Sequence, residues 1–161
     1  MNEKMKNNYT NWQGIGTDYK NNFGFVYKVS DPISGLFYIG RKNYWAYKTV
    51  KSRRHKRPEN DINNKHFKDN FKESDWKTYK TSARNKDFKK LIKEKEDTLT
   101  WEVLVNCGTK GLLNYLENFI ILKSSDFLLD PLCQNGHVGK IYKPSILIRE
   151  TLKDNYMELD K

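Results

Sequence analysis

One carboxylate stands on the apolar side of a predicted helix. The segment 112–123 is strongly apolar, which predicts a buried helix. Glu117 lies within its apolar stripe, four residues after Leu113 and four before Ile121. An ionised carboxylate in such a place loses its hydration, which costs several kcal/mol unless a partner compensates. We therefore expect Glu117 to contact either an Arg or Lys, which is the commoner case, or a divalent metal ion.

Two tyrosines lie on neighbouring strands of a predicted β-hairpin. Residues 24–40 contain two runs rich in β-branched and aromatic side chains, separated by a turn with Pro and Gly. If Val29 pairs with Leu36, antiparallel pairing places Tyr27 opposite Tyr38. Both phenols would then project side by side from one face of the hairpin.

A guanidinium is expected on the same side. Phe88 and Ile92 belong to the apolar stripe of a second helix, for which Thr81 and Ser82 offer an N-terminal cap. Arg84 precedes Phe88 by four residues and falls on that stripe, although an Arg there often only extends along apolar surface to reach water. If both helices face one sheet, Arg84 and the helical carboxylate converge near the tyrosines. Such a set suits a phosphodiester, because a metal ion and a cation hold negative charge and a phenol handles a proton.

The composition is typical of a protein that binds nucleic acid. The chain has 161 residues, which is one ordinary domain, with Lys+Arg 30 against Asp+Glu 20, a net charge of +10 and 14% aromatic residues. This balance suits binding to a polyanion, but a merely soluble basic protein would share it. Two cysteines are too few for the disulfide framework of a small secreted domain, so we expect a reducing, cytoplasmic setting. The N-terminus has no signal-peptide core, and no apolar run has membrane-spanning length, so no membrane partner is expected.

The chain divides into an arm, a domain and a tail. Residues 1–22 are polar and predict an arm with little regular structure, residues 23–143 form the domain, and residues 144–161 form a short C-terminal tail. A third strand is expected over 98–106, where alternation places Val103 and Val105 on one face. The order of elements is therefore hairpin, helix, strand and helix.

A basic segment follows the hairpin and shows no helical or strand period. Such a run is usually a solvated loop, and the functional alternative is a loop that grips phosphates. Its candidate DNA-binding residues are Lys51, Arg53, Arg54, Lys56 and Arg57.

Two cysteines and two histidines offer an alternative metal site, for zinc. Cys133 and His137, with Cys107 and His66, could supply four ligands. No CxxC or HxxxH pair accompanies them, however, and zinc sites normally use recognisable ligand clusters. We therefore do not favour zinc.

The ordered residues resemble the GIY-YIG nuclease superfamily. Val26-Tyr27 and Tyr38-Ile39-Gly40 are similar to the two halves of its motif, although the first half reads Phe-Val-Tyr here. The resemblance implies an α+β fold, a small three-stranded antiparallel sheet flanked by helices, over roughly residues 23–141. It is closest to phage-encoded proteins related to freestanding homing endonucleases. The further shared features are Arg41, Lys42, Glu73-Ser74-Asp75-Trp76, Tyr79, Ser82, Asn114-Tyr115-Leu116-Glu117 and Asn135.

The resemblance implies hydrolysis of double-stranded DNA with one divalent cation, usually Mg²⁺, or another such as Mn²⁺. By the family pattern Glu117 holds the metal, Tyr27 acts as general base or orients the water, and Tyr38 supports the phosphate. An ordinary tyrosine has a pKa near 10, so a base of this kind needs nearby positive charge.

The resemblance leaves three candidates for the catalytic cation, because a long basic insertion delays the helix that usually carries it. Arg84 is the first candidate, and Arg41 and Lys42 at the exit of the hairpin are next. Asn135 matches an Asn that often follows the metal-ligand helix and is a candidate DNA contact, but Asn135-Gly136 is also an ordinary turn signal.

Two functions remain open at this point. The first is a metal-dependent DNA endonuclease, acting as a monomer or weak dimer, and in the host cytoplasm if the chain is phage-encoded. The second is a DNA-binding module on a GIY-YIG fold that no longer cleaves, since a fold does not guarantee activity.

Overall fold

The computed structural model describes most of the domain. It leaves out the basic segment with Lys51, Arg53, Arg54, Lys56 and Arg57 and the predicted tail, so the predictions for both lie outside the described residues. Among the helices that are described, none is long and apolar enough to cross a membrane. The described ranges are 12–48, 62–124, 130–139 and 141–142.

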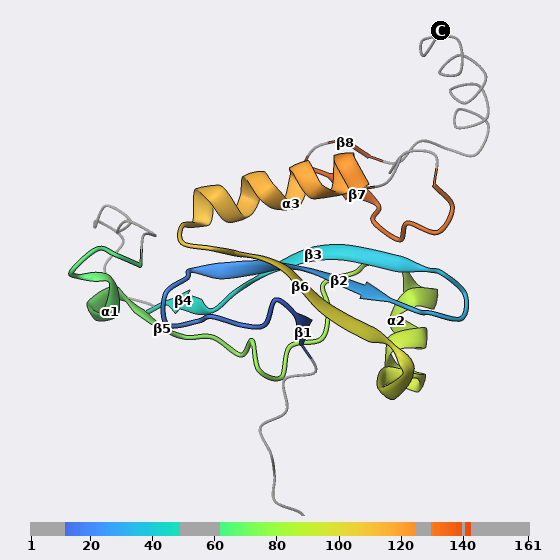
Figure 1. The fold of residues 1–161 in the computed structure, drawn as a ribbon, viewed down its shortest axis with the longest axis horizontal. Coiled ribbons are helices and arrows are strands. Elements are labelled where there is room, and N and C mark those ends of the chain that lie inside the picture. The colour runs from blue at the N-terminus through green and yellow to red at the C-terminus, as the bar shows by residue number, and fades with distance from the viewer. Residues whose placement is uncertain (1–11, 49–61, 125–129, 140, 143–161) are drawn as a thin grey trace, which may run out of the picture.

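Four strands form the central sheet, in the order β1-β6-β2-β3 (Figure 1). The strands β6, β2 and β3 are antiparallel, as the sequence predicts, while β1 pairs parallel to β6. The prediction of a three-stranded sheet is therefore wrong by one short strand. The strands are β1 (Gln13–Gly14), β2 (Gly24–Ser30), β3 (Phe37–Asn43) and β6 (Thr100–Cys107).

The extra strand comes from the predicted arm because Trp12 is part of the core. Its side chain is buried, and its ring lies 4.9 Å from the ring of Tyr27 and 5.6 Å from that of Trp101. Its indole N–H donates to the carbonyl of Trp76 at 3.3 Å. Burial of a ring of this size brings the adjoining backbone against β6, where Gln13 and Gly14 pair with that strand.

The hairpin register differs from the predicted one by two residues. Val29 pairs with Tyr38 rather than Leu36, and Tyr27 pairs with Gly40. Because side chains alternate with period two, a shift of two keeps both tyrosines on the same face. The two rings are diagonal neighbours, with centroids 6.2 Å apart.

The turn explains this register. The N–H of Asp31 donates to the carbonyl of Leu36 at 2.9 Å, so these two residues close the turn, one residue beyond the last strand pair of Ser30 with Phe37. The Asp31 carboxylate also accepts from the N–H of Ile33 at 3.0 Å and from the hydroxyl of Ser34 at 2.7 Å. These local bonds fix the turn, and the turn fixes the pairing.

A β-bulge in β6 reverses the predicted alternation. Val103 pairs with Tyr27 and Val105 with Val26, which leaves Leu104 as an extra residue. Val103 therefore packs in the core on one face of the sheet, while Val105 packs against the core on the other. The prediction that the two valines share a face is wrong.

The two longer helices cover opposite faces of the sheet (Figure 1). The helix α3 (Lys110–Ser124) confirms the predicted apolar helix, and α2 (Lys86–Glu94) buries Phe88 and Ile92 as expected. The cap of α2 is Asn85, whose side chain accepts from two backbone N–H groups, at 2.9 and 3.1 Å. The predicted cap at residues 81–82 is therefore wrong.

Two short strand pairs and one short helix complete the part of the fold that the structure describes. They are β4 (Trp45–Tyr47) with β5 (Phe71–Glu73), α1 (Phe67–Asn70) beside them, and β7 (His137–Val138) with β8 (Ile141–Tyr142) next to α3.

Candidate functional site

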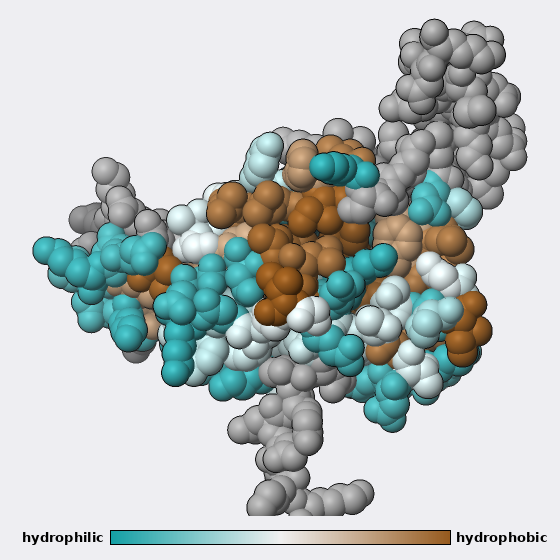
Figure 2. All heavy atoms as spheres, viewed as in Figure 1, coloured by the Kyte–Doolittle hydropathy of each residue, from teal (hydrophilic) through white to brown (hydrophobic). Residues whose placement is uncertain are grey.

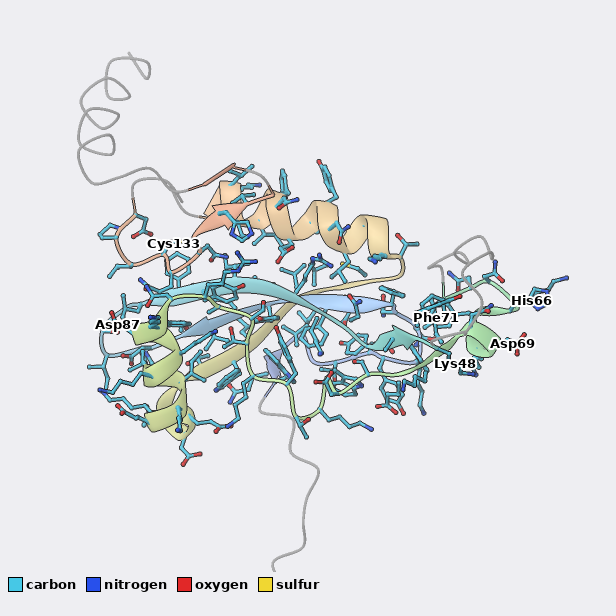
Figure 3. The ribbon with its side chains drawn as sticks, turned by 180° about the vertical axis from the view of Figure 1, so that it is seen from behind. Lys48, His66, Asp69, Phe71, Asp87 and Cys133 are labelled. Atoms are coloured by element: carbon cyan, nitrogen blue, oxygen red, sulfur yellow. The ribbon has the colours of Figure 1, made fainter. Side chains whose placement is uncertain are left out.

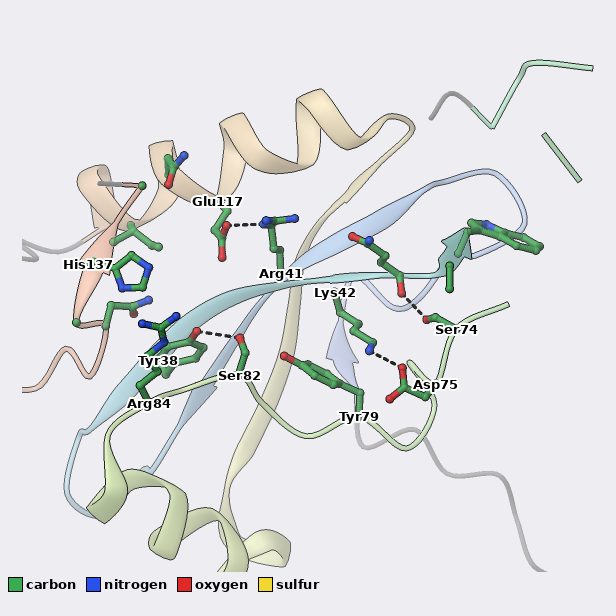
Figure 4. A pocket seen from close by; sticks show the side chains of 18 residues that line it. Tyr38, Arg41, Lys42, Ser74, Asp75, Tyr79, Ser82, Arg84, Glu117 and His137 are labelled. Carbon is green, nitrogen blue, oxygen red and sulfur yellow. Dashed lines mark hydrogen bonds and ion pairs between the residues drawn. The ribbon is translucent and has the colours of Figure 1, made fainter. Parts of the chain in front are cut away.

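A cavity of about 590 Å³ opens between β3, α3, the segment 74–84 and the segment 135–139 (Figure 4). The sheet supplies its floor and α3 one wall, and the segment that leads into α2 supplies the opposite wall. Predicted site residues thus converge from elements far apart in the chain. Those that line the cavity are Tyr38, Arg41, Lys42, Arg84, Glu117 and Asn135.

Glu117 has the charged partner that its position on an apolar stripe requires. The Nε of Arg41 lies 2.7 Å from its Oε2, and the two side chains are 35% and 21% exposed for Arg41 and Glu117. Burial raises the pKa of the Glu117 carboxyl, and the charge and hydrogen bond of Arg41 oppose that rise. The carboxylate is therefore under-solvated and would gain from additional positive charge.

The donor set around Glu117 suits a hard, hydrated cation. In the described part of the chain, no three His, Cys, Asp or Glu side chains gather as a metal cluster. Mg²⁺ is commonly held by one or two carboxylates, with waters and substrate phosphate oxygens filling the other positions. One carboxylate at the wall of an open polar cavity fits that pattern, and Glu117 is the residue that would hold the ion.

The three candidate cations differ in what already neutralises them. Arg41 pairs with Glu117, and the Nζ of Lys42 lies 2.6 Å from an oxygen of Asp75. Arg84 forms no ion pair with any acidic side chain in the described ranges, and Figure 4 shows it beside Tyr38. Its charge is therefore the one most available to an incoming anion.

Tyr38 faces the cavity as a protonated phenol. Its hydroxyl lies 3.1 Å from that of Ser82. Burial raises the pKa of the Tyr38 phenol, while the hydrogen bond from Ser82 and the charge of Arg84 act in the opposite direction. Near neutral pH the hydroxyl can therefore donate a hydrogen bond to a phosphate oxygen or a water.

Tyr27 does not line the cavity, so its predicted place on the same concave surface is wrong. Its side chain is 0% exposed, because β2 lies between β3 and β6 and other aromatic rings cover it. Its hydroxyl is 3.2 Å from that of Tyr79 and accepts from the N–H of Ser82 at 3.5 Å. Burial raises the pKa of the Tyr27 phenol well above its ordinary value, which disfavours the predicted role as general base.

Asn135 holds a strand in place. It is 4% exposed, its Oδ1 accepts from the N–H of Ile39 at 2.9 Å, and its Nδ2 donates to the carbonyl of the same residue at 2.6 Å. This pairing fastens the segment after α3 to the outer edge of β3. Both polar groups are engaged with the backbone of β3, which supports an anchoring role for Asn135. Its direct contact with DNA stays a prediction.

Tyr79, Ser82 and His137 are among the cavity-lining residues that the sequence did not single out as site residues. Tyr79 lies under the Lys42 ammonium, which is 4.0 Å from its ring centroid, and Ser82 contacts Tyr38. His137 is on β7, and its charge lowers the pKa of Glu117. The only sequence signal for Tyr79 and Ser82 was their place in the family resemblance; His137 stood out only as a possible zinc ligand.

The possible zinc ligands are not brought together. His66 pairs with Asp69 at 3.3 Å at the α1 end of the molecule, away from Cys133 (Figure 3). Cys107 and Cys133 are buried in the core beneath α3, and burial raises the pKa of the Cys107 thiol to about 11. The absence of a metal cluster among the described residues agrees with this separation.

Residues 7–132 match the family model SegE_GIY-YIG, described as "Putative endonuclease segE, GIY-YIG domain". The chain belongs to this GIY-YIG family. Members of GIY-YIG families are nucleases, that is, phosphodiester hydrolases. No curated protein and no solved structure matches the chain.

The GIY-YIG motif has a packing role that the structure makes visible. Gly40 ends the second half of the motif and pairs with Tyr27, which ends the first half. A Cβ at Gly40 would lie 2.6 Å from the Tyr27 hydroxyl and 2.7 Å from the ring of Tyr38. Glycine is therefore needed there because the Tyr27 ring crosses the backbone of β3.

Proposed function

We propose that this GIY-YIG protein is a metal-dependent DNA endonuclease, with a homing role as the family resemblance implies. The observation that carries the proposal is the cavity that Glu117 and Arg84 both face: Glu117 is an under-solvated carboxylate, and Arg84 is a guanidinium with no acidic partner among the described residues. A phosphodiester needs such a pair, because a cation bound at the carboxylate and the guanidinium can share its negative charge.

Glu117 would hold the divalent ion, Mg²⁺ or Mn²⁺. When bound, such an ion polarises a phosphoryl oxygen and stabilises the charge that develops on it. Arg41 already contacts the Glu117 carboxylate, so it fixes the orientation of that side chain at the cavity wall.

Arg84 and Tyr38 act on the phosphate from the other side. Arg84 would hold a non-bridging oxygen, and the protonated Tyr38 would donate a hydrogen bond to the same phosphate or to a water beside it. Lys42 is fixed by Asp75 and by the ring of Tyr79 and would contribute to the positive potential of the rim. Tyr27 would be a positioning residue, acting through its hydroxyl contact with Tyr79.

The proposed substrate is double-stranded DNA. The net charge of +10 and the basic segment after the hairpin support a polyanion, and the candidate DNA-binding residues of that segment keep their proposed role. DNA binding should weaken steeply with salt, because each phosphate contact releases a counterion. A phage-encoded enzyme of this kind would act in the host cytoplasm.

The decisive experiment is cleavage of supercoiled plasmid with Mg²⁺, comparing the native chain with Glu117→Gln. We expect the native chain to nick or linearise the plasmid and the variant to lose activity by about 100-fold or more, because changing even the groups that support a metal ligand costs about 10- to 100-fold. Glu94→Gln is the matched control, because Glu94 is an exposed carboxylate on α2 outside the cavity.

Two outcomes would reject parts of the proposal. Equal cleavage by the native chain and Glu117→Gln would exclude Glu117 as the metal ligand. Tight binding of the plasmid without cleavage by the native chain, with Mg²⁺ or Mn²⁺, would favour the alternative of a non-cleaving DNA-binding module. Mapping of the cleavage sites on random DNA would then test the homing role.

A further inference from the structure

The outer face of α3 carries an exposed apolar stripe. The sequence predicts a buried helix there, yet only one side of α3 packs against the sheet, through Leu113 and Ile121. Figure 2 shows apolar surface gathered over this helix. The exposed fractions are 45% for Leu112, 63% for Tyr115, 44% for Phe119 and 53% for Leu122.

The spacing of the stripe is that of a helix-pairing seam. The four residues follow one another at intervals of three, four and three, which is the a/d spacing of a coiled coil. Tyr115 and Phe119 are stacked, with an angle of 13° between their planes and centroids 6.0 Å apart. The centre of the stripe is therefore a flat aromatic surface suited to another helix.

The order of side chains along the stripe is self-complementary. It reads aliphatic, aromatic, aromatic, aliphatic, with symmetric spacing. A second α3 laid antiparallel about a two-fold axis at residue 117 would place Leu112 against Leu122 and Tyr115 against Phe119. Each contact then occurs twice, as a two-fold interface requires. We propose that the partner of this face is a second copy of the chain, paired through antiparallel α3 helices.

Like charges do not meet at the centre of the paired stripes, but they do meet at the ends. The stripe has no acidic side chain, because Glu117 points the other way and contacts Arg41. The antiparallel arrangement brings Lys110 of one copy near Lys123 of the other. Because salt screens like charges, the dimer should strengthen as salt is added, opposite to DNA binding.

The stripe is short, so the dimer should be weak. It spans eleven residues, or about 16 Å of helix, well below the extent of a standard stable interface. We expect a dissociation constant on the order of micromolar. The catalytic cavity lies on the sheet side of α3, so pairing leaves both cavities open, and the inference does not depend on cleavage activity.

Sedimentation velocity over a series of protein concentrations tests the dimer. The native chain should change from monomer to dimer within the micromolar range, and Phe119→Glu should raise the dissociation constant at least tenfold. Ile33→Glu is the matched control, because Ile33 is an apolar side chain, 79% exposed, on the hairpin turn. A native chain that remains monomeric throughout, or equal weakening by both variants, would overturn the proposal.

Cysteine crosslinking tests the orientation of the helices. Leu112→Cys and Leu122→Cys, mixed and oxidised, should give a linked dimer, whereas neither variant alone should, since equivalent residues in the two copies would lie about 15 Å apart. The native Cys107 and Cys133 are buried and should give little background. Efficient linking of either variant alone would mean a parallel pair, and no linking of the mixture would exclude this interface; both results would overturn the proposal.

Discussion

The strands β2 and β3 each carry one half of the GIY-YIG motif, and they use their tyrosines differently. Tyr27 on β2 is fully buried, while Tyr38 on β3 reaches the cavity. The difference follows from strand order: β2 has a neighbour on each side, and β3 is the last strand of the sheet. One half of the motif therefore builds the core, and the other half presents side chains to the site.

The outer edge of β3 is covered in a way that serves the site. The backbone of Phe37 bonds the chain at Leu132 and Gln134, and Asn135 bonds Ile39. An uncovered edge strand would be open to pairing with other chains. The segment that protects this edge leads directly to His137 and the rest of the cavity wall.

The largest expected effect is the loss of folding stability when the buried tyrosine of β2 is removed. Tyr27→Ala should lower the free energy of unfolding by about 3–5 kcal/mol, because it removes a fully buried aromatic ring. Tyr38→Ala should cost clearly less, since Tyr38 is only partly buried. Urea denaturation of both variants measures this; equal losses would contradict the division of roles between the two strands.

The next largest effect is on the rate of DNA cleavage, and it concerns Arg84, which lies in the cavity beside Tyr38 of β3. Arg84→Ala should reduce the rate of DNA cleavage by about 100- to 1,000-fold, as for removal of one charge-stabilising donor. Its free energy of unfolding should change by no more than about 0.5 kcal/mol, because Arg84 forms no ion pair within the described residues. Lys93→Ala, on α2 and outside the cavity, is the control; a similar loss in both variants would indicate only a general effect of positive charge.

A smaller effect tests the contact between the two strands. Gly40→Ala should lower the free energy of unfolding by about 1–3 kcal/mol, because the new Cβ would overlap the Tyr27 side chain. Gly111→Ala is the matched control: nothing lies within 4 Å of the Cβ it would add, and it stands in the first turn of α3. Thermal unfolding of both variants decides the matter, and an unchanged midpoint for Gly40→Ala would refute the packing role of this glycine.

As pH rises and Glu117 loses its proton, the rate of cleavage should increase and the contribution of Glu117 to stability should decrease. Its raised pKa means that it takes up a proton above the ordinary glutamic acid value of about 4.3. Cleavage should fall about tenfold per pH unit below the raised pKa, because only the carboxylate binds a metal ion, and the fall should move to lower pH as Mg²⁺ is increased.

The contribution of Glu117 to the free energy of unfolding should change with pH in the opposite direction to the cleavage rate. The folded state holds this proton more tightly than the unfolded state, so the Glu117 contribution to stability is greatest below the ordinary pKa and is lost as pH rises through the raised one. Urea denaturation across this pH range, with Glu117→Gln for comparison, isolates the contribution. An identical pH dependence in both chains would show that the Glu117 pKa is not raised by folding.

Local patterns predicted much of the fold because they act over short distances. The apolar periods identified α2, α3 and β6, and the turn residues identified the hairpin. The same patterns missed the bulge at Leu104 and the cap at Asn85. Neighbouring residues compete for each of these positions, and the spacing of apolar residues does not show which one occupies it. The patterns also missed β1, which forms only because Trp12 is buried against the sheet.

For the site, the sequence by itself determined the chemistry of Glu117, since a carboxylate on an apolar stripe needs positive charge wherever the helix packs. It also determined the family, through the ordered motif residues. Only the tertiary structure decided that Arg41 meets Glu117, that Arg84 keeps its charge open to the cavity, and that Tyr27 lies in the core. The physical reason is that burial and pairing depend on which strand becomes central and which segments cover it, and these are properties of the assembled sheet.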